Sequence, residues 1–118
     1  MNRDDISADG NEIRIGDKSF LAEHPHPIKK YVIVDDDVIV VRFRYGVDDD
    51  IDRNIAAFAS DGHRLWTVEQ PDVPPAHDAD PFVNIYVRDG QLRGVTYWGG
   101  DYRIDHETGT LDDKKDSR

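Results

Sequence analysis

The chain has 118 residues, enough for one domain that buries about two thirds of its unfolded surface around a single core. Its formal net charge is −10, from 25 acidic and 15 basic residues, so its surface repels phosphate backbones and anionic membranes. We therefore expect neither nucleic-acid nor membrane binding. The lack of cysteine excludes disulfides, thiolate zinc sites and cysteine nucleophiles.

The acidity has two interpretations. Of the 25 acidic residues 21 are aspartates, and the 10 arginines outnumber the 5 lysines. This composition resembles that of haloarchaeal proteins, in which a high salt concentration screens the repulsion between carboxylates. The alternative is an ordinary acidic protein, because aspartates are common in turns. The sequence leaves both open.

The apolar residues favour strands over helices. Valine and isoleucine together number 21, against 4 leucines, and 11 residues are aromatic. Branched and aromatic side chains suit the pleated surface of a sheet. No window of ten residues or more carries a helical period, so the composition and the pattern both predict an all-β protein.

The two ends of the chain are polar. Residues 1–12 lack the apolar stretch of a signal peptide, and the longest apolar run, Ile55–Ala59, is too short to cross a bilayer. We expect a cytoplasmic protein with a flexible segment at 1–12, one β domain at 13–111 and a polar tail at 112–118.

Short apolar runs alternate with turn residues throughout the predicted domain, as is typical of consecutive antiparallel hairpins. The predicted strand pairs are 12–15 with 18–21, 28–34 with 38–45, 54–59 with 64–70, and 82–88 with 92–98, followed by strands at 102–104 and 110–111. We expect an antiparallel meander of about eight to ten short strands, folded as a two-layer sandwich or a partly open barrel.

Alternation within two of these strands predicts which side chains face the core. In the strand 38–45, one row is wholly apolar and is predicted to be buried: Ile39, Val41, Phe43 and Tyr45. The opposite row is apolar at one end and basic at the other, which indicates partial cover by a neighbouring segment. In the strand 82–88, we expect the row Val83, Ile85 and Val87 to point inward.

The hairpin at residues 54–70 contains Ala57-Phe58 followed by Gly62-x-x-x-Trp66, and Asp105-x-x-Thr108-Gly109 partly repeats this pattern 47 residues later. The pattern resembles the repeat of quinoprotein-type β-propellers (the PQQ repeat). The resemblance covers about a fifth of the chain and implies a shared way of building a hairpin, with Trp66 buried and Asp61-Gly62 at an exposed turn. A closed propeller needs about four or more blades, which this length does not supply. The resemblance therefore implies no cofactor site, and we expect no cofactor.

Two groups of residues are candidate metal ligands. His24 and His26 alternate along an extended segment, a spacing found in metal sites on β scaffolds, although the prolines between and after them also suit a rigid linker. Asp48, Asp50 and Asp52 alternate as in a calcium loop. That loop would require Gly where Arg53 stands and Glu where Ala59 stands, which favours a solvated acidic turn.

No catalytic motif is present: the sequence lacks the nucleophile elbow Gly-x-Ser-x-Gly, the phosphate-binding P-loop and the dinucleotide fingerprint Gly-x-Gly-x-x-Gly. We predict no catalytic residues. Carboxylate pairs are too numerous for any one to be informative.

A binding surface is predicted at the loops, because loops carry function on a rigid scaffold. The proline-rich segment 71–81 is the longest irregular stretch of the core, and 46–53 is a second candidate. The candidate residues are His77, Asp78, Asp80, Tyr86, Trp98 and Tyr102. The aromatic members form either an exposed face for a protein or sugar, or a second core layer.

The expected function is a non-catalytic module that binds a ligand or a protein, including another copy of itself. Two alternatives belong to other classes. One is a carboxylate-based hydrolase or isomerase in the mouth of a small barrel, and the other is a carrier of a divalent cation or small ligand.

The two interpretations of the acidity predict different responses to salt. A protein adapted to high salt should lose its fold in dilute buffer, because its carboxylates are then unscreened. Circular dichroism across a potassium chloride series, from about 10 mM to about 2 M, measures this. Equal stability at both ends of the series would contradict the high-salt interpretation and favour the ordinary acidic protein.

Overall fold

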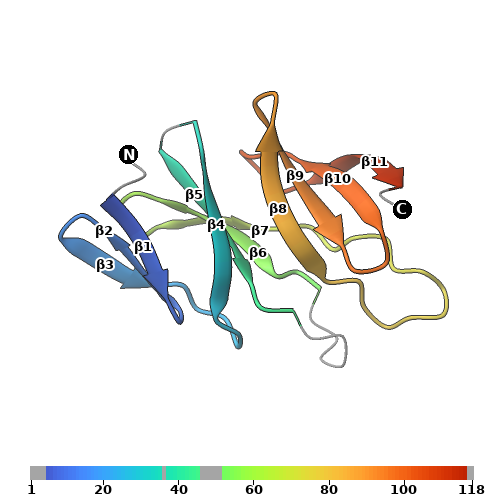
Figure 1. Cartoon of the computed structure of the whole chain (residues 1–118), viewed down its shortest axis with the longest axis horizontal. Helices are drawn as coiled ribbons and strands as arrows, with labels where there is room; N and C mark the ends of the chain where they lie inside the picture. Colours follow the sequence, from blue (N-terminus) through green and yellow to red (C-terminus); the bar gives the residue numbers. More distant parts are fainter. Residues whose placement is uncertain (1–4, 36, 46–51, 117–118) are drawn as a thin grey trace.

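The computed structural model describes residues 5–35, 37–45 and 52–116. Within these residues the fold is all-β, with eleven antiparallel strands in three sheets and no closed barrel. The prediction of an antiparallel, sandwich-like β fold is therefore confirmed. The three sheets follow one another along the long axis of the molecule (Figure 1).

The sheets are made of strands that are nearly consecutive in sequence. The N-terminal sheet contains β1 (Ile6–Asp9), β2 (Glu12–Ile15) and β3 (Lys18–Leu21). The central sheet contains β4 (Ile28–Val34), β5 (Val38–Phe43), β6 (Ile55–Ala59) and β7 (Arg64–Thr67). The C-terminal sheet contains β8 (Phe82–Arg88), β9 (Gln91–Thr96), β10 (Gly100–Ile104) and β11 (Leu111–Asp116), in the order β11-β10-β9-β8.

The central sheet is buried on both faces, which explains the continuous apolar runs in β5 and β6. Alternate residues of β5 point to opposite sides: Ile39 and Val41 pack against the N-terminal sheet, while Val40 packs toward the C-terminal sheet. The strand β6 divides in the same way, with Ala57 and Phe58 on opposite sides. The protein thus has two cores, one on each side of this sheet.

The predicted inward row of β5 is confirmed except at its end. Ile39, Val41 and Phe43 are fully buried, whereas Tyr45 lies past the end of the strand and is 38% exposed.

The predicted inward row of β8 is wrong at two of its three residues: Val83 is only partly buried and belongs to neither core, and Val87 is 43% exposed. A bulge between Phe82 and Asn84 shifts the register of β8 against β9, so Phe82 and Ile85 are the residues that enter the core. Val87 lies near the hairpin turn, beyond the core.

Strands also form at both ends of the chain, where irregular segments were predicted. β1 lies in the segment 1–12, because its Ile6 pairs with Ile15 and is buried in the core between the N-terminal and central sheets. β11 lies in the polar segment 112–118, and its aspartates pair with arginines of β9 and β10. The sequence showed no apolar period in β11 because paired charges face its outer side.

Trp66 is buried, as predicted, in the core between the central and C-terminal sheets, and Asp61 is exposed at the turn between β6 and β7. The indole packs on Gly109, where an added Cβ would come within 2.6 Å of the ring, and its Nε1 donates to the carbonyl of His106. The two partial copies of the hairpin pattern therefore meet in space. This contact packs β7 against the turn that precedes β11.

Asn54 connects the central and C-terminal sheets. Its side chain is fully buried, and its Oδ1 accepts the backbone N–H of Phe82 while its Nδ2 donates to the Phe82 carbonyl, both at 2.9 Å. The same Nδ2 donates to the carbonyl of Phe43 at 3.1 Å. One amide side chain thus takes the place of a neighbouring strand where β8 begins.

Replacing Asn54 with Leu should lower the free energy of unfolding by about 3 kcal/mol, because it leaves the buried backbone N–H and C=O of Phe82 unpaired and removes a hydrogen bond to Phe43. Urea denaturation followed by circular dichroism measures the loss. The matched control is Asn84→Leu on the exposed side of β8, which should change stability by less than about 1 kcal/mol. Similar effects of the two substitutions would contradict the role given to Asn54.

Candidate functional site

The main cleft of the described structure lies where the 71–81 loop meets the turn between β9 and β10. Its volume is about 520 Å³, within the range of small-ligand sites. The described lining residues are Asp72, Pro74, His77, Asp80, Trp98, Gly99, Gly100, Lys114 and Lys115. The loop predicted to carry the binding surface thus forms one wall.

The aromatic wall of the cleft is a stacked pair of rings. The imidazole of His77 lies on the indole of Trp98, with ring centroids 3.6 Å apart and planes 14° apart. Tyr97 contacts the same indole edge-on at 4.8 Å. Because His77 is exposed, the outer face of its ring is available for stacking with a ligand.

Trp98 is fixed from both its backbone and its side chain. Its backbone N–H donates to Oδ1 of Asp80 at 2.8 Å, and its Nε1 donates to the carbonyl of Ala79 at 3.1 Å. The N–H of Tyr97 donates to the carbonyl of Pro81. The loop and the turn therefore hold each other, and the position of the indole is set before any ligand binds.

Two buried carboxylates support the loop from beneath. Asp80 and Asp52 are 3% and 5% exposed. Oδ2 of Asp52 accepts the backbone N–H of Asp80 at 3.5 Å and the side-chain amide of Gln70 at 3.4 Å. A buried carboxylate is costly unless it accepts hydrogen bonds, so these contacts explain why both aspartates are tolerated in the interior.

The floor and the basic side of the cleft come from the turn and β11. Gly100 has no room for a side chain, because an added Cβ would lie 2.9 Å from the ring of Tyr102. The ammonium of Lys114 lies 5.5 Å from the centre of the same ring, and Lys115 is exposed.

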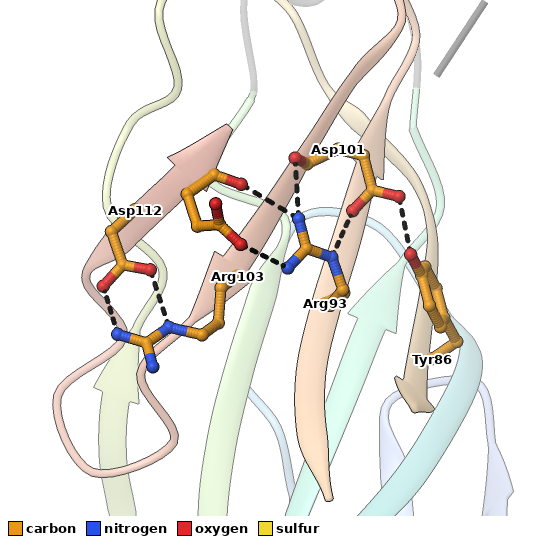
Figure 2. A network of polar contacts seen from close by, with 6 residues as sticks. Tyr86, Arg93, Asp101, Arg103 and Asp112 are labelled. Carbon is orange, nitrogen blue, oxygen red and sulfur yellow. Dashed lines mark hydrogen bonds and ion pairs between the residues drawn. The ribbon is translucent and has the colours of Figure 1, made fainter. Parts of the chain in front are cut away.

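A network of charges covers the outer face of the C-terminal sheet (Figure 2). Arg93 is 6% exposed, and its Nε donates to Oδ1 of Asp101 at 2.7 Å. The hydroxyl of Tyr86 donates to the other oxygen of Asp101 at 2.6 Å, and this bond raises the pKa of Tyr86. Arg103 and Asp112 form a bidentate pair, and the bonds from Arg103 lower the pKa of Asp112.

The residues predicted as a binding surface separate into three groups. His77, Asp80 and Trp98 line the cleft, and Asp78 is exposed in the same loop. Tyr102 is 4% exposed in the core beneath the floor, and its hydroxyl accepts the N–H of Asp72. Tyr86 lies on the outer face of the sheet in the arginine network. The structure does not bring all six together.

The candidate metal ligands are also dispersed. The rings of His24 and His26 lie 5.8 Å apart and are tilted, and His24 stacks on Phe43 at 3.9 Å. Asp52 lies in the distant loop support, while Asp48 and Asp50 fall outside the described residues. In the part of the chain that the structure describes, no three side chains of His, Asp or Glu gather as a metal site would require.

Sequence reasoning missed the basic side of the cleft. Lys114 and Lys115 stand in a segment taken for a polar tail, and Asp72 was not singled out within its loop. The sequence did contain a signal for this basic side. Lys114 and Lys115 are adjacent, and they account for two of the five lysines in a strongly acidic chain.

The whole of this architecture falls within one family. A family model described as "Domain of unknown function (DUF7957)" matches residues 3–116. The chain belongs to this family. No curated protein and no solved structure matches it significantly.

The resemblance to the quinoprotein-type propeller repeat is therefore wrong. The matching family is a different one, and the described strands form three stacked sheets without the ring of blades that defines a propeller. None of the described residues lies in a helix that is long and apolar enough to cross a membrane.

Burial lowers the pKa of His24 below its ordinary value of 6.5, and the nearby charges of His26 and Arg64 act in the same direction. The unfolded chain therefore binds a proton at His24 before the folded protein does. Stability from this residue should be complete above about pH 6.5 and should be lost as the pH falls toward the lower folded pKa.

Replacing His24 with Asn tests this, because Asn can still accept the hydrogen bond that Nδ1 receives from the N–H of His26. The variant should show a smaller fall of melting temperature between pH 7 and pH 5 than the unmodified protein. The control is His63→Asn at an exposed turn, which should keep the full pH dependence. An unchanged slope in His24→Asn would refute the assignment.

Proposed function

We propose that this domain is a non-catalytic binding module whose ligand site is the cleft between the 71–81 loop and the turn at residues 97–100. The observation that carries the proposal is the fixed ring pair of His77 and Trp98, presented at the wall of a cleft of about 520 Å³. A preorganised aromatic surface loses little entropy when a ligand stacks on it.

The roles of the buried carboxylates favour binding over catalysis. A hydrolase or isomerase needs a carboxylate that faces the substrate and exchanges a proton with it. Asp80 directs Oδ1 at the backbone of Trp98, and Asp52 receives the N–H of Asp80 and the amide of Gln70. Both side chains act as structural acceptors that hold the loop.

The character of the cleft indicates a small ligand or a short exposed segment of a partner protein. Its walls combine two rings, a floor of two glycines and charged side chains of both signs. Such mixed sites take ligands that have a flat face and polar edges, and sugars, ring compounds and peptides satisfy this. Self-association through the same surface is a further form of the proposal.

Nuclear magnetic resonance titration of isotopically labelled protein tests the site. The probes are cellohexaose, a proline-rich decapeptide, AMP and glucuronate, and the reporters are the backbone amides of Gly99 and Gly100. Binding of at least one probe should shift these amides. His77→Ala should then weaken that binding by about three- to tenfold, the usual value of one ring contact.

The control is His63→Ala, which removes an exposed imidazole at the turn between β6 and β7, next to Gly62 and its contact with Phe20 of the N-terminal sheet, and should leave the affinity unchanged. Light scattering of the same samples measures self-association. The proposal fails if no probe shifts the cleft amides and the protein stays monomeric, or if a hydrolase screen finds turnover that Asp80→Asn abolishes.

A further inference from the structure

The two lysines of the cleft belong to a strand that is rich in aspartate, yet those aspartates are engaged elsewhere. Asp112 accepts two hydrogen bonds from Arg103, at 2.7 and 2.6 Å. Asp113 receives Arg93 at both its carboxylate and its carbonyl. The two carboxylates that precede the lysines in sequence are thus bound by arginines of the neighbouring strands (Figure 2).

Lys115 also lies directly opposite Asp101 in the register of β10 and β11. Both oxygens of Asp101 are already occupied, Oδ1 by Nε of Arg93 and Oδ2 by the hydroxyl of Tyr86. Within residues 5–35, 37–45 and 52–116, neither Lys114 nor Lys115 forms an ion pair. Lys114 and Lys115 therefore give the cleft two cationic groups that form no ion pair among these residues, alongside the acidic Asp72 and in a chain of net charge −10.

We infer that the ligand of this cleft carries an anionic group, a carboxylate or a phosphate, on a flat ring. This inference rests on the proposed function and names the ligand class of the same site. The ring stacks on the outer face of His77, and the anionic group is held by Lys115, with Lys114 beside it.

Asp72 is the opposing charge of the cleft. Its backbone is fixed by the bond from its N–H to the hydroxyl of Tyr102, and its carboxylate is exposed at the wall. It limits how strongly an anion binds and selects ligands whose negative charge is confined to the lysine side. The cleft thus distinguishes the two ends of a ligand.

The test compares pairs of probes that share a ring and differ in the presence of an anionic group. AMP is compared with adenosine and glucuronate with glucose, again by the amide shifts of Gly99 and Gly100. The charged member of at least one pair should bind at least fivefold more tightly than the neutral member, the value of about one unit charge near an exposed lysine. The pair that responds tells whether the ring is aromatic or a sugar.

Charge variants give opposite results at the two walls. Lys115→Gln should weaken binding of the charged probe about fivefold, and Asp72→Asn should strengthen it to a similar extent. The matched control is Lys29→Gln, which makes the same change of net charge at an exposed position of β4 and should leave binding unchanged. Raising the salt concentration should reduce the difference between the charged and neutral probes.

The inference is overturned if adenosine or glucose shifts the amides as strongly as its charged counterpart, or if cellohexaose or the peptide binds while AMP and glucuronate do not. In both cases the ligand class is wrong and the binding module stands. If none of the probes shifts the cleft, this inference fails, and the binding module fails with it when the protein also stays monomeric.

Discussion

The side chain of Asn54 is the constraint on which the arrangement of the two larger sheets depends. A backbone N–H and C=O at the start of β8 are buried without a neighbouring strand, and an unpaired group there would cost about 1–3 kcal/mol. Asn54 satisfies both groups of Phe82 and also bonds to Phe43 in β5. It therefore fixes where the C-terminal sheet begins relative to the central sheet, and Phe82 enters the core from that point.

The cleft inherits its geometry from this junction. Asp80 lies two residues before Phe82, and Asp52 lies two residues before Asn54. Like Asn54, both are buried side chains that accept hydrogen bonds from backbone N–H groups. A loop with proline at four of its eleven positions loses little conformational entropy when it is ordered. A few buried polar contacts are then enough to hold His77 against Trp98, which a flexible loop would not achieve.

Local signals in the sequence were sufficient for the hairpins and for the burial of Trp66, because turn residues and alternation act over a few residues. Local signals did not predict the features that depend on contacts between residues far apart in sequence. The bulge at Phe82 and Asn84 changes which side chains of β8 enter the core, and no local pattern reveals it. β11 has no apolar period, since its register is supported by ion pairs to β9 and β10. Tyr102 was grouped with Trp98 by proximity in sequence, but strand alternation places it in the core.

The basic side of the cleft is the part of the candidate site that composition alone does not predict. A net charge of −10 argues against anionic ligands when charge is averaged over the surface. Within a cleft, however, the nearest uncompensated groups dominate, because more distant charges are screened within about 10 Å. Arg93 and Arg103 form ion pairs with Asp101, Asp112 and Asp113, whereas Lys114 and Lys115 form none within the described residues. The excess of arginine over lysine thus has a local consequence: Arg93 and Arg103 bind carboxylates of β10 and β11, and two of the five lysines line the cleft.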